Sequence, residues 1–278
     1  MILLFNKKFN SILICILFPI LFWGQVKNIG LPEIRNYKRS DYKGGTQNWN
    51  IDQDENDNVY FANNDGLFQF DGSVWSKYTL PNKSVVRSIK TDKSGKIYVG
   101  GYNEFGYFKT DTNGRLVYFS LSKYLNKKNI STIDIIWKIH IYNDEVIFQS
   151  FENAFILKNN RIKIMKPPSR FQFSFISGQR LFFQDISNGI LEYKNGKLHS
   201  LQNTTALNKT EVWGIFNLSA TQLLISTLDK GLFLYEDRQL KQWNTEANVF
   251  ITKNSGLGGA TIKNNYIALN SVLNGVII

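Results

Sequence analysis

Four oxygen-bearing side chains alternate along residues 52–58, a spacing at which such groups can enclose a calcium ion. The stretch reads DQDENDN, and the alternating residues are Asp52, Asp54, Asn56 and Asn58. A calcium loop of this type also needs glycine at its sixth place and an acid at its twelfth, where this chain has Asp57 and Asn63. The corresponding segment of the next unit, KTDKSGK, is an ordinary turn. The sequence therefore favours a hairpin turn, with calcium binding as the alternative.

Residues suited to catalysis are sparse. The two histidines, His140 and His199, fall in different units and lack metal-ligand spacing. His140 alternates with Lys138 and Tyr142 on an expected strand, which would place it on a sheet surface. No nucleophile-elbow, phosphate-loop or zinc-protease motif occurs. We predict no catalytic, metal or cofactor-binding residues, no cofactor, and a protein that is not an enzyme.

Three tryptophans recur at similar places in the chain. Trp49, Trp137 and Trp213 each open a short segment of strand-forming residues. Aromatic rings at such places can line a channel and stack on sugars or peptides. Their periodic recurrence favours packing between repeated units instead. They are our only candidates for ligand binding, and weak ones.

These residues lie within an internal repeat of about 42 residues. A small residue before a strand-like run marks each copy, at Gly66, Gly106, Ala154, Gly189, Gly231 and Gly275. An apolar run precedes each mark, such as VYFA or LLIST. A further hairpin follows in most copies, and dipeptides such as Asp71-Gly72 and Asn195-Gly196 close tight turns. No stretch of useful length after residue 25 has helical periodicity.

Four short strands in each repeat predict an all-β fold, a β-propeller of four-stranded blades. A β-sandwich or an extended solenoid would explain the strand spacing but not six returns of one motif order. Because the sixth copy stops soon after its third strand begins, we expect an incomplete propeller of about five and a half blades. Open strand edges in such a chain would favour marginal folding or aggregation.

The first residues differ from the rest. Lys7 and Lys8 precede the apolar run SILICILFPILFW, and Gly24 follows it, as in a secretory signal peptide. The only cysteine, Cys15, lies inside this segment. A retained membrane anchor is the alternative. We assign 1–24 to a signal peptide, 25–46 to a lead-in and 47–278 to the partial propeller, with repeats near 47–80, 85–120, 135–165, 171–200, 211–245 and 259–278.

Charge gives little support for nucleic-acid binding. The net charge is +11 over 278 residues, but basic residues are scattered among acidic ones. No run of five or more like charges appears. Solvated strand faces and turns explain the excess of lysine and arginine, and we expect no nucleic-acid partner through this region.

Residues 44–108 resemble the start of a known group of proteins. The shared pattern is an aromatic pair, then Asp-Gly-Leu, then an aromatic residue with Asp-Gly, as in NVYFANNDGLFQFDG. The group comprises the propeller-repeat periplasmic sensor regions of Bacteroidetes two-component and related regulators. The resemblance covers residues 44–278 and is strongest in the first two repeats. It is closer to the triple-tyrosine, LuxR-like branch than to the hybrid histidine kinases.

This resemblance implies an exported, periplasmic, ligand-sensing region. In such proteins two propellers precede a three-tyrosine domain, a membrane helix and a kinase or DNA-binding output, and the parent can form a homodimer. The chain stops at Ile278 without those parts, so we expect an N-terminal fragment whose ligand is an unknown small molecule or glycan. A secreted carbohydrate-active propeller enzyme and a surface adhesion or assembly propeller are the alternatives.

Overall fold

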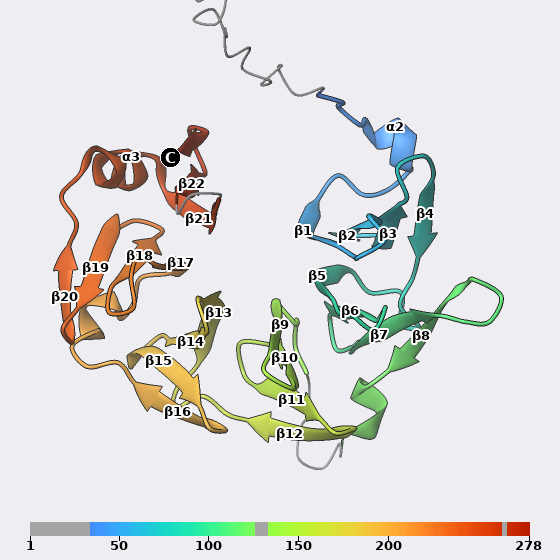
Figure 1. Cartoon of the computed structure of the whole chain (residues 1–278), viewed down its shortest axis with the longest axis horizontal. Helices are drawn as coiled ribbons and strands as arrows, with labels where there is room; N and C mark the ends of the chain where they lie inside the picture. The colour runs from blue at the N-terminus through green and yellow to red at the C-terminus, as the bar shows by residue number, and fades with distance from the viewer. Residues whose placement is uncertain (1–33, 126–132, 263–265) are drawn as a thin grey trace, which may run out of the picture. The chain divides into compact units, whose positions relative to one another are not determined.

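The protein is an all-β propeller built from small antiparallel sheets. The computed structural model describes residues 34–125, 133–262 and 266–278, so the expected signal peptide lies outside the described residues. The chain divides into two compact units, residues 1–38 and 39–278, and every sheet belongs to the second. Five sheets have four strands and the last has three. Each sheet pairs its strands in chain order, and the sheets follow one another around an arc (Figure 1).

The strands occur in six successive groups, which we call sheets 1 to 6. Sheet 1 contains β1 (Asn48–Gln53), β2 (Val59–Asn63), β3 (Gly66–Phe70) and β4 (Trp75–Tyr78). Sheet 2 contains β5 (Val86–Thr91), β6 (Ile97–Gly101), β7 (Phe105–Thr110) and β8 (Leu116–Ser120). Sheet 3 contains β9 (Lys138–Tyr142), β10 (Glu145–Gln149), β11 (Ala154–Lys158) and β12 (Arg161–Met165). Sheet 4 contains β13 (Phe171–Ser177), β14 (Arg180–Asp185), β15 (Gly189–Lys194) and β16 (Lys197–Ser200). Sheet 5 contains β17 (Val212–Asn217), β18 (Leu223–Thr227), β19 (Leu232–Glu236) and β20 (Gln239–Gln242). Sheet 6 contains β21 (Gly256–Thr261), β22 (Ile267–Ser271) and β23 (Val276–Ile277).

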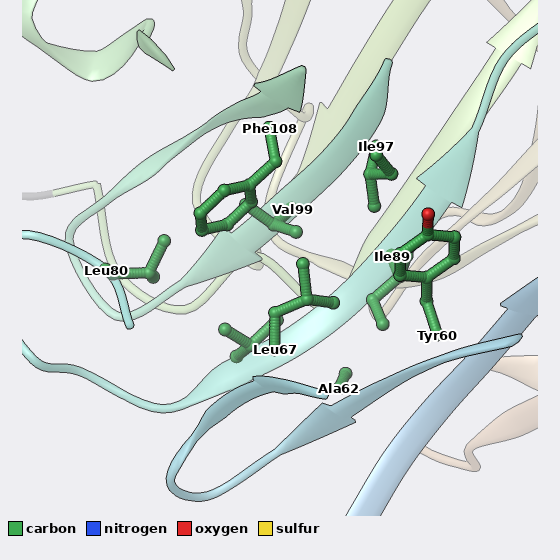
Figure 2. Packing of buried hydrophobic residues seen from close by; sticks show 9 residues of the cluster. Tyr60, Ala62, Leu67, Leu80, Ile89, Ile97, Val99 and Phe108 are labelled. Carbon is green, nitrogen blue, oxygen red and sulfur yellow. The ribbon is translucent and has the colours of Figure 1, made fainter. Parts of the chain in front are cut away.

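Apolar side chains fill the space between neighbouring sheets. Figure 2 shows the first of these layers, where Ala62 and Leu67 of sheet 1 meet Ile89 and Val99 of sheet 2. Four further clusters join sheets 2 and 3, 3 and 4, 4 and 5, and 5 and 6. Among the described residues, no such cluster joins sheet 6 to sheet 1, and Figure 1 shows these two sheets on opposite sides of an opening in the arc. Each layer buries faces that one small sheet cannot cover alone.

In some sheets, the small residue that marks each repeat before its third strand is required for steric reasons. Gly231 has φ +79°, and a methyl group added there would overlap the Asn248 Oδ1 atom. Only glycine suits such a place, because both the backbone and the available space exclude a side chain. Ala154 occupies the corresponding place in sheet 3 without a positive φ. The alanine is therefore tolerated there without the strain that a left-handed backbone would cause.

The expectation that no stretch of useful length after residue 25 has helical periodicity did not anticipate two short helices. A single turn, α2 (Arg39–Tyr42), precedes sheet 1, and α3 (Glu246–Asn254) connects sheets 5 and 6. Thr245 caps α3 by accepting a hydrogen bond from the Asn248 backbone N–H. The helix residue Ile251 is fully buried. Two 3₁₀ turns, η2 (Ser122–Tyr124) and η3 (Thr205–Leu207), complete the described elements.

The DQDENDN stretch forms a hairpin turn between β1 and β2. The Asp54 Oδ1 atom accepts hydrogen bonds from the Asn56 and Asn58 backbone N–H groups at 2.9 and 3.0 Å, and Oδ2 accepts one from the Tyr60 hydroxyl at 3.0 Å. Asp92 accepts the equivalent hydrogen bonds in the turn between β5 and β6, from the Ser94 and Lys96 backbone N–H groups and the Tyr98 hydroxyl. Both carboxylate oxygens of Asp54, one of the four alternating residues, are thus engaged by hydrogen bonds within the hairpin.

A candidate ligand site in the central channel

The innermost strand of nearly every sheet is bulged at one corresponding place. Pairing shifts between residues 48 and 50 in β1, 86 and 88 in β5, 171 and 174 in β13, 212 and 214 in β17, and 256 and 259 in β21. In β9 the corresponding residue, Trp137, lies just before the strand and bonds through its backbone to Gln149. A bulge re-aims a side chain without ending the ladder. The residues at these places are Trp49, Arg87, Trp137, Phe173, Trp213 and Gly258.

Arg87 lies between two tryptophans. Its guanidinium carbon is 3.6 Å from the centre of the Trp49 ring and 5.6 Å from that of Trp137. The two rings meet edge to face at 6.4 Å. Arg87 Nε and Nη1 are buried without a hydrogen-bond partner among the described residues, and burial lowers the pKa of Arg87. Ring stacking therefore replaces the usual acid partner of a partly buried arginine.

The aromatic contacts continue around the ring. Trp137 meets Phe173 at 6.2 Å, and Phe173 meets Trp213 at 4.7 Å. Phe151 stacks on Trp137 at 5.3 Å and widens this wall. In sheet 6 the corresponding residue is Gly258, with φ +109°, where an added methyl group would lie 3.0 Å from the Trp213 carbonyl oxygen. The aromatic wall thus runs from sheet 1 to sheet 5 and stops at a glycine.

A cavity of ≈ 740 Å³ lies among the innermost strands and has Trp137 and Trp213 in its wall. This volume is in the range of pockets that hold small molecules. Its only charged or titratable lining residues among those described are Asp52, Lys90, Lys138 and His140. Lys90 Nζ lies 3.0 Å from both Asp52 carboxylate oxygens, and Asp52 also accepts from the Thr91 backbone at 2.6 Å. That aspartate and lysine compensate each other's charge.

Lys138 and His140 project from β9 into the same cavity. Lys138 Nζ lies 5.4 Å from the centre of the Phe173 ring, and burial lowers its pKa. His140 Nε2 lies 2.8 Å from Ser174 Oγ of the next sheet. Burial, and next the charge of Lys138, lower the pKa of His140 to about 3, so the ring is neutral near neutral pH. With its lysines protonated, the lining carries two positive charges against the one negative charge of Asp52.

The three tryptophans predicted as candidates occupy equivalent inner positions. Trp137 and Trp213 line the cavity, while Trp49 is 40% exposed and donates to Asn64 Oδ1 at 2.8 Å. All three also contact aromatic rings of other sheets, which is the packing between repeated units that their recurrence favours. Their role in binding stays a prediction.

Sequence reasoning missed two members of the ring, Arg87 and Phe173, and the position of Lys138 in the cavity wall. Arg87 stands in VRSIK at the place that tryptophan takes in neighbouring repeats, so residue-by-residue alignment of the repeats could have found it. Phe173 lies in a segment whose inner strand had no tryptophan to mark it. Lys138 belongs to the IWKIH segment, and the sequence pattern placed its neighbour His140 on a sheet surface, whereas both line the channel.

Fold and cavity together define a propeller with a central pocket. No known protein-family profile matches the chain, and no curated protein matches it by sequence. The structure is similar to the extracellular domain of BT4673 from B. thetaiotaomicron, which its two solved structures name as a one component system and as a hybrid two component system. In the first of these the TM-score is 0.63 at 15% identity, over 82% of this chain and 31% of that one.

A propeller enzyme is similar to the same degree. A catalytically inactive variant of virginiamycin B lyase from Staphylococcus aureus, solved with quinupristin, gives a TM-score of 0.63 at 14% identity, over 88% of this chain and 81% of that one. These likenesses confirm the propeller predicted from the repeats. The chain spans about a third of the BT4673 structures, 31% of each.

Proposed function

We propose that this chain is an extracytoplasmic ligand-sensing propeller region of a signal-transduction or transcription regulator. The observation that carries the proposal is the ≈ 740 Å³ cavity, which the innermost strands of all six sheets surround. The fold shared with an extracellular domain of a bacterial regulator supports the same role. The charged and apolar start of the sequence, a signal-peptide pattern, supports export to the periplasm.

The sensing step would be a shift between conformations of the ring. A ligand in the cavity would touch strands from several sheets at once, and so would favour the arrangement of sheets that fits it best. Output module, membrane anchoring and a homodimeric parent belong to this proposal through the resemblance to such regulators. Across residues 34–125, 133–262 and 266–278, no helix has the length and hydrophobicity of a membrane span.

The enzyme alternative receives less support from the cavity. Cleavage of a glycan needs two carboxylates or a comparable acid and base facing the substrate. Among the described lining residues, Asp52 is the only carboxylate, and Lys90 and Thr91 already engage it. His140 contacts Ser174, and burial, followed by the charge of Lys138, lowers its pKa and disfavours its protonation. No observation here favours the adhesion or assembly alternative.

The test is binding without turnover. The full chain is incubated with a panel of oligosaccharides and small organic acids, while its melting temperature is recorded and each compound is recovered for mass spectrometry. We expect a compound that raises the melting temperature and returns intact. Trp213→Ala should abolish the shift, whereas Tyr124→Ala, at a 70% exposed residue outside the cavity, should retain it. Recovery of cleaved compound would support the enzyme alternative, and equal shifts in both variants would place the site elsewhere.

A further inference from the structure

The charge of the channel indicates which ligands it can accept. Lys138 has no carboxylate within ion-pair distance among the described residues, and neither has Arg87 at the adjoining ring. In contrast, Lys90 is paired with Asp52. A partly desolvated cation without an acid is a costly arrangement that an incoming anion relieves.

The aromatic wall places that unpaired charge beside flat apolar surface. Lys138 Nζ lies over the Phe173 ring, which in turn contacts Trp137 and Trp213. Arg87 adds a second cation where it stacks against Trp137. A ligand that fits this wall therefore has a planar or apolar body and an oxyanion at one end.

We propose that the channel binds small anionic molecules, in which an oxyanion pairs with Lys138 and the rest of the ligand packs against Trp137 and Trp213. Arg87 is a positioning residue that holds the Trp137 ring and adds to the positive potential. This inference rests on the proposed binding function, because it names the chemical class that the same cavity takes. Carboxylate and phosphate share the required chemistry, and the probes below separate them.

The experiment uses three probes with one common ring system: 2-naphthoate, 2-naphthyl phosphate and the uncharged 2-naphthamide. Binding to the full chain is measured by titration calorimetry, with quenching of tryptophan fluorescence as a second readout. We expect at least one anion to bind about tenfold or more tightly than the amide, since charged hydrogen bonds are the stronger ones. The tighter of the two anions identifies carboxylate or phosphate as the preferred group.

Two variants test the assignment to Lys138. Lys138→Gln should weaken binding of the preferred anion about tenfold while leaving the affinity for the amide unchanged. Lys241→Gln, which removes the same charge from exposed β20, should leave both affinities as they are. Arg87→Gln should reduce the affinity for the preferred anion less than Lys138→Gln does. Melting curves establish that each variant folds.

Three results would overturn the inference. Equal binding of the amide and both anions, lost in Trp137→Ala, would leave the cavity as a ligand site but remove its preference for anions. Failure of all three probes to bind would also count against this inference, whereas the proposed function would then be decided by the wider panel. Unchanged anion affinity in Lys138→Gln would exclude the assigned contact.

Discussion

At the residue scale, Asp185 shows how one buried carboxylate organises a corner of a sheet. It is fully buried at the end of β14. It accepts hydrogen bonds from the Ser169 backbone and hydroxyl, from the Ser187 backbone, and from the Asn188 backbone and side chain. Burial opposes the charged form, but the bonds led by Ser169 outweigh it and hold the pKa of Asp185 below its usual value.

Asp185→Asn should lower the free energy of unfolding by about 2 kcal/mol at neutral pH, because an amide replaces one acceptor oxygen with a donor. The depressed folded-state pKa means that the stabilisation is complete above the unfolded value of about 3.9 and is lost as pH falls through the folded value. Urea unfolding between neutral pH and about pH 3 should therefore show a shallower acid dependence for the variant. Asp237→Asn, at an exposed turn, is the control and should match the parent.

At the element scale, the glycine that precedes the third strand can be explained by lack of room for a side chain or by its backbone conformation. Two variants separate these causes. Gly231 and Gly114 have almost the same φ, +79° and +77°, but a methyl group at Gly114 would meet nothing within 4 Å. Gly114→Ala should cost only the backbone strain, about 1 kcal/mol. Gly231→Ala should cost a further ~1–3 kcal/mol, because Asn248 must also move.

Chemical unfolding of the two glycine variants under identical conditions measures this difference. Equal losses would mean that Asn248 yields without cost and that the conformation alone selects glycine. A larger loss in Gly114→Ala would contradict the packing described between β19 and α3.

The helix between sheets 5 and 6 offers a second test at this scale. Thr245→Ala removes the side-chain acceptor of the first turn of α3 and should lower the free energy of unfolding by about 1 kcal/mol. Thr245→Ser keeps the acceptor and should restore most of the loss. If serine destabilises as much as alanine, the threonine methyl group rather than the cap is responsible.

The repeats could be predicted from sequence because each strand carries its own pattern, whereas α3 and the channel could not. Ala247, Phe250 and Ile251 have helical spacing after a capping threonine, but the segment is short and lies within strand-rich surroundings. Lys138 became visible as a candidate site residue only when the fold brought separate inner strands together. Sequence separation hides such convergence because no local pattern records it.

At the scale of the whole molecule, the described chain is a series of sheets that each contact their neighbours in sequence. Five apolar clusters join successive sheets, so an inner sheet such as sheet 3 has two apolar interfaces while sheets 1 and 6 have one each. Stability in such an array depends on neighbouring interfaces, and local opening is easiest where they are fewest.

Hydrogen exchange should therefore rank the sheets by position. Backbone amides of β10 and β14, in sheets with two neighbours, should exchange more slowly than those of the equivalent strands β2 and β22. Mass spectrometry of exchanged, digested full chain measures this directly. Uniform protection of all four strands would show that sheets 1 and 6 have a further packing partner in solution.

The repeated bulge has an evolutionary consequence. It gives the channel a re-aimed position in five of the six sheets, and together with Trp137 before β9 these positions hold Trp, Arg, Trp, Phe, Trp and Gly. If the channel binds a ligand as proposed, a lineage that carries this scaffold can acquire a new chemical preference through point mutations at those positions, within the limits set by their packing against neighbouring sheets.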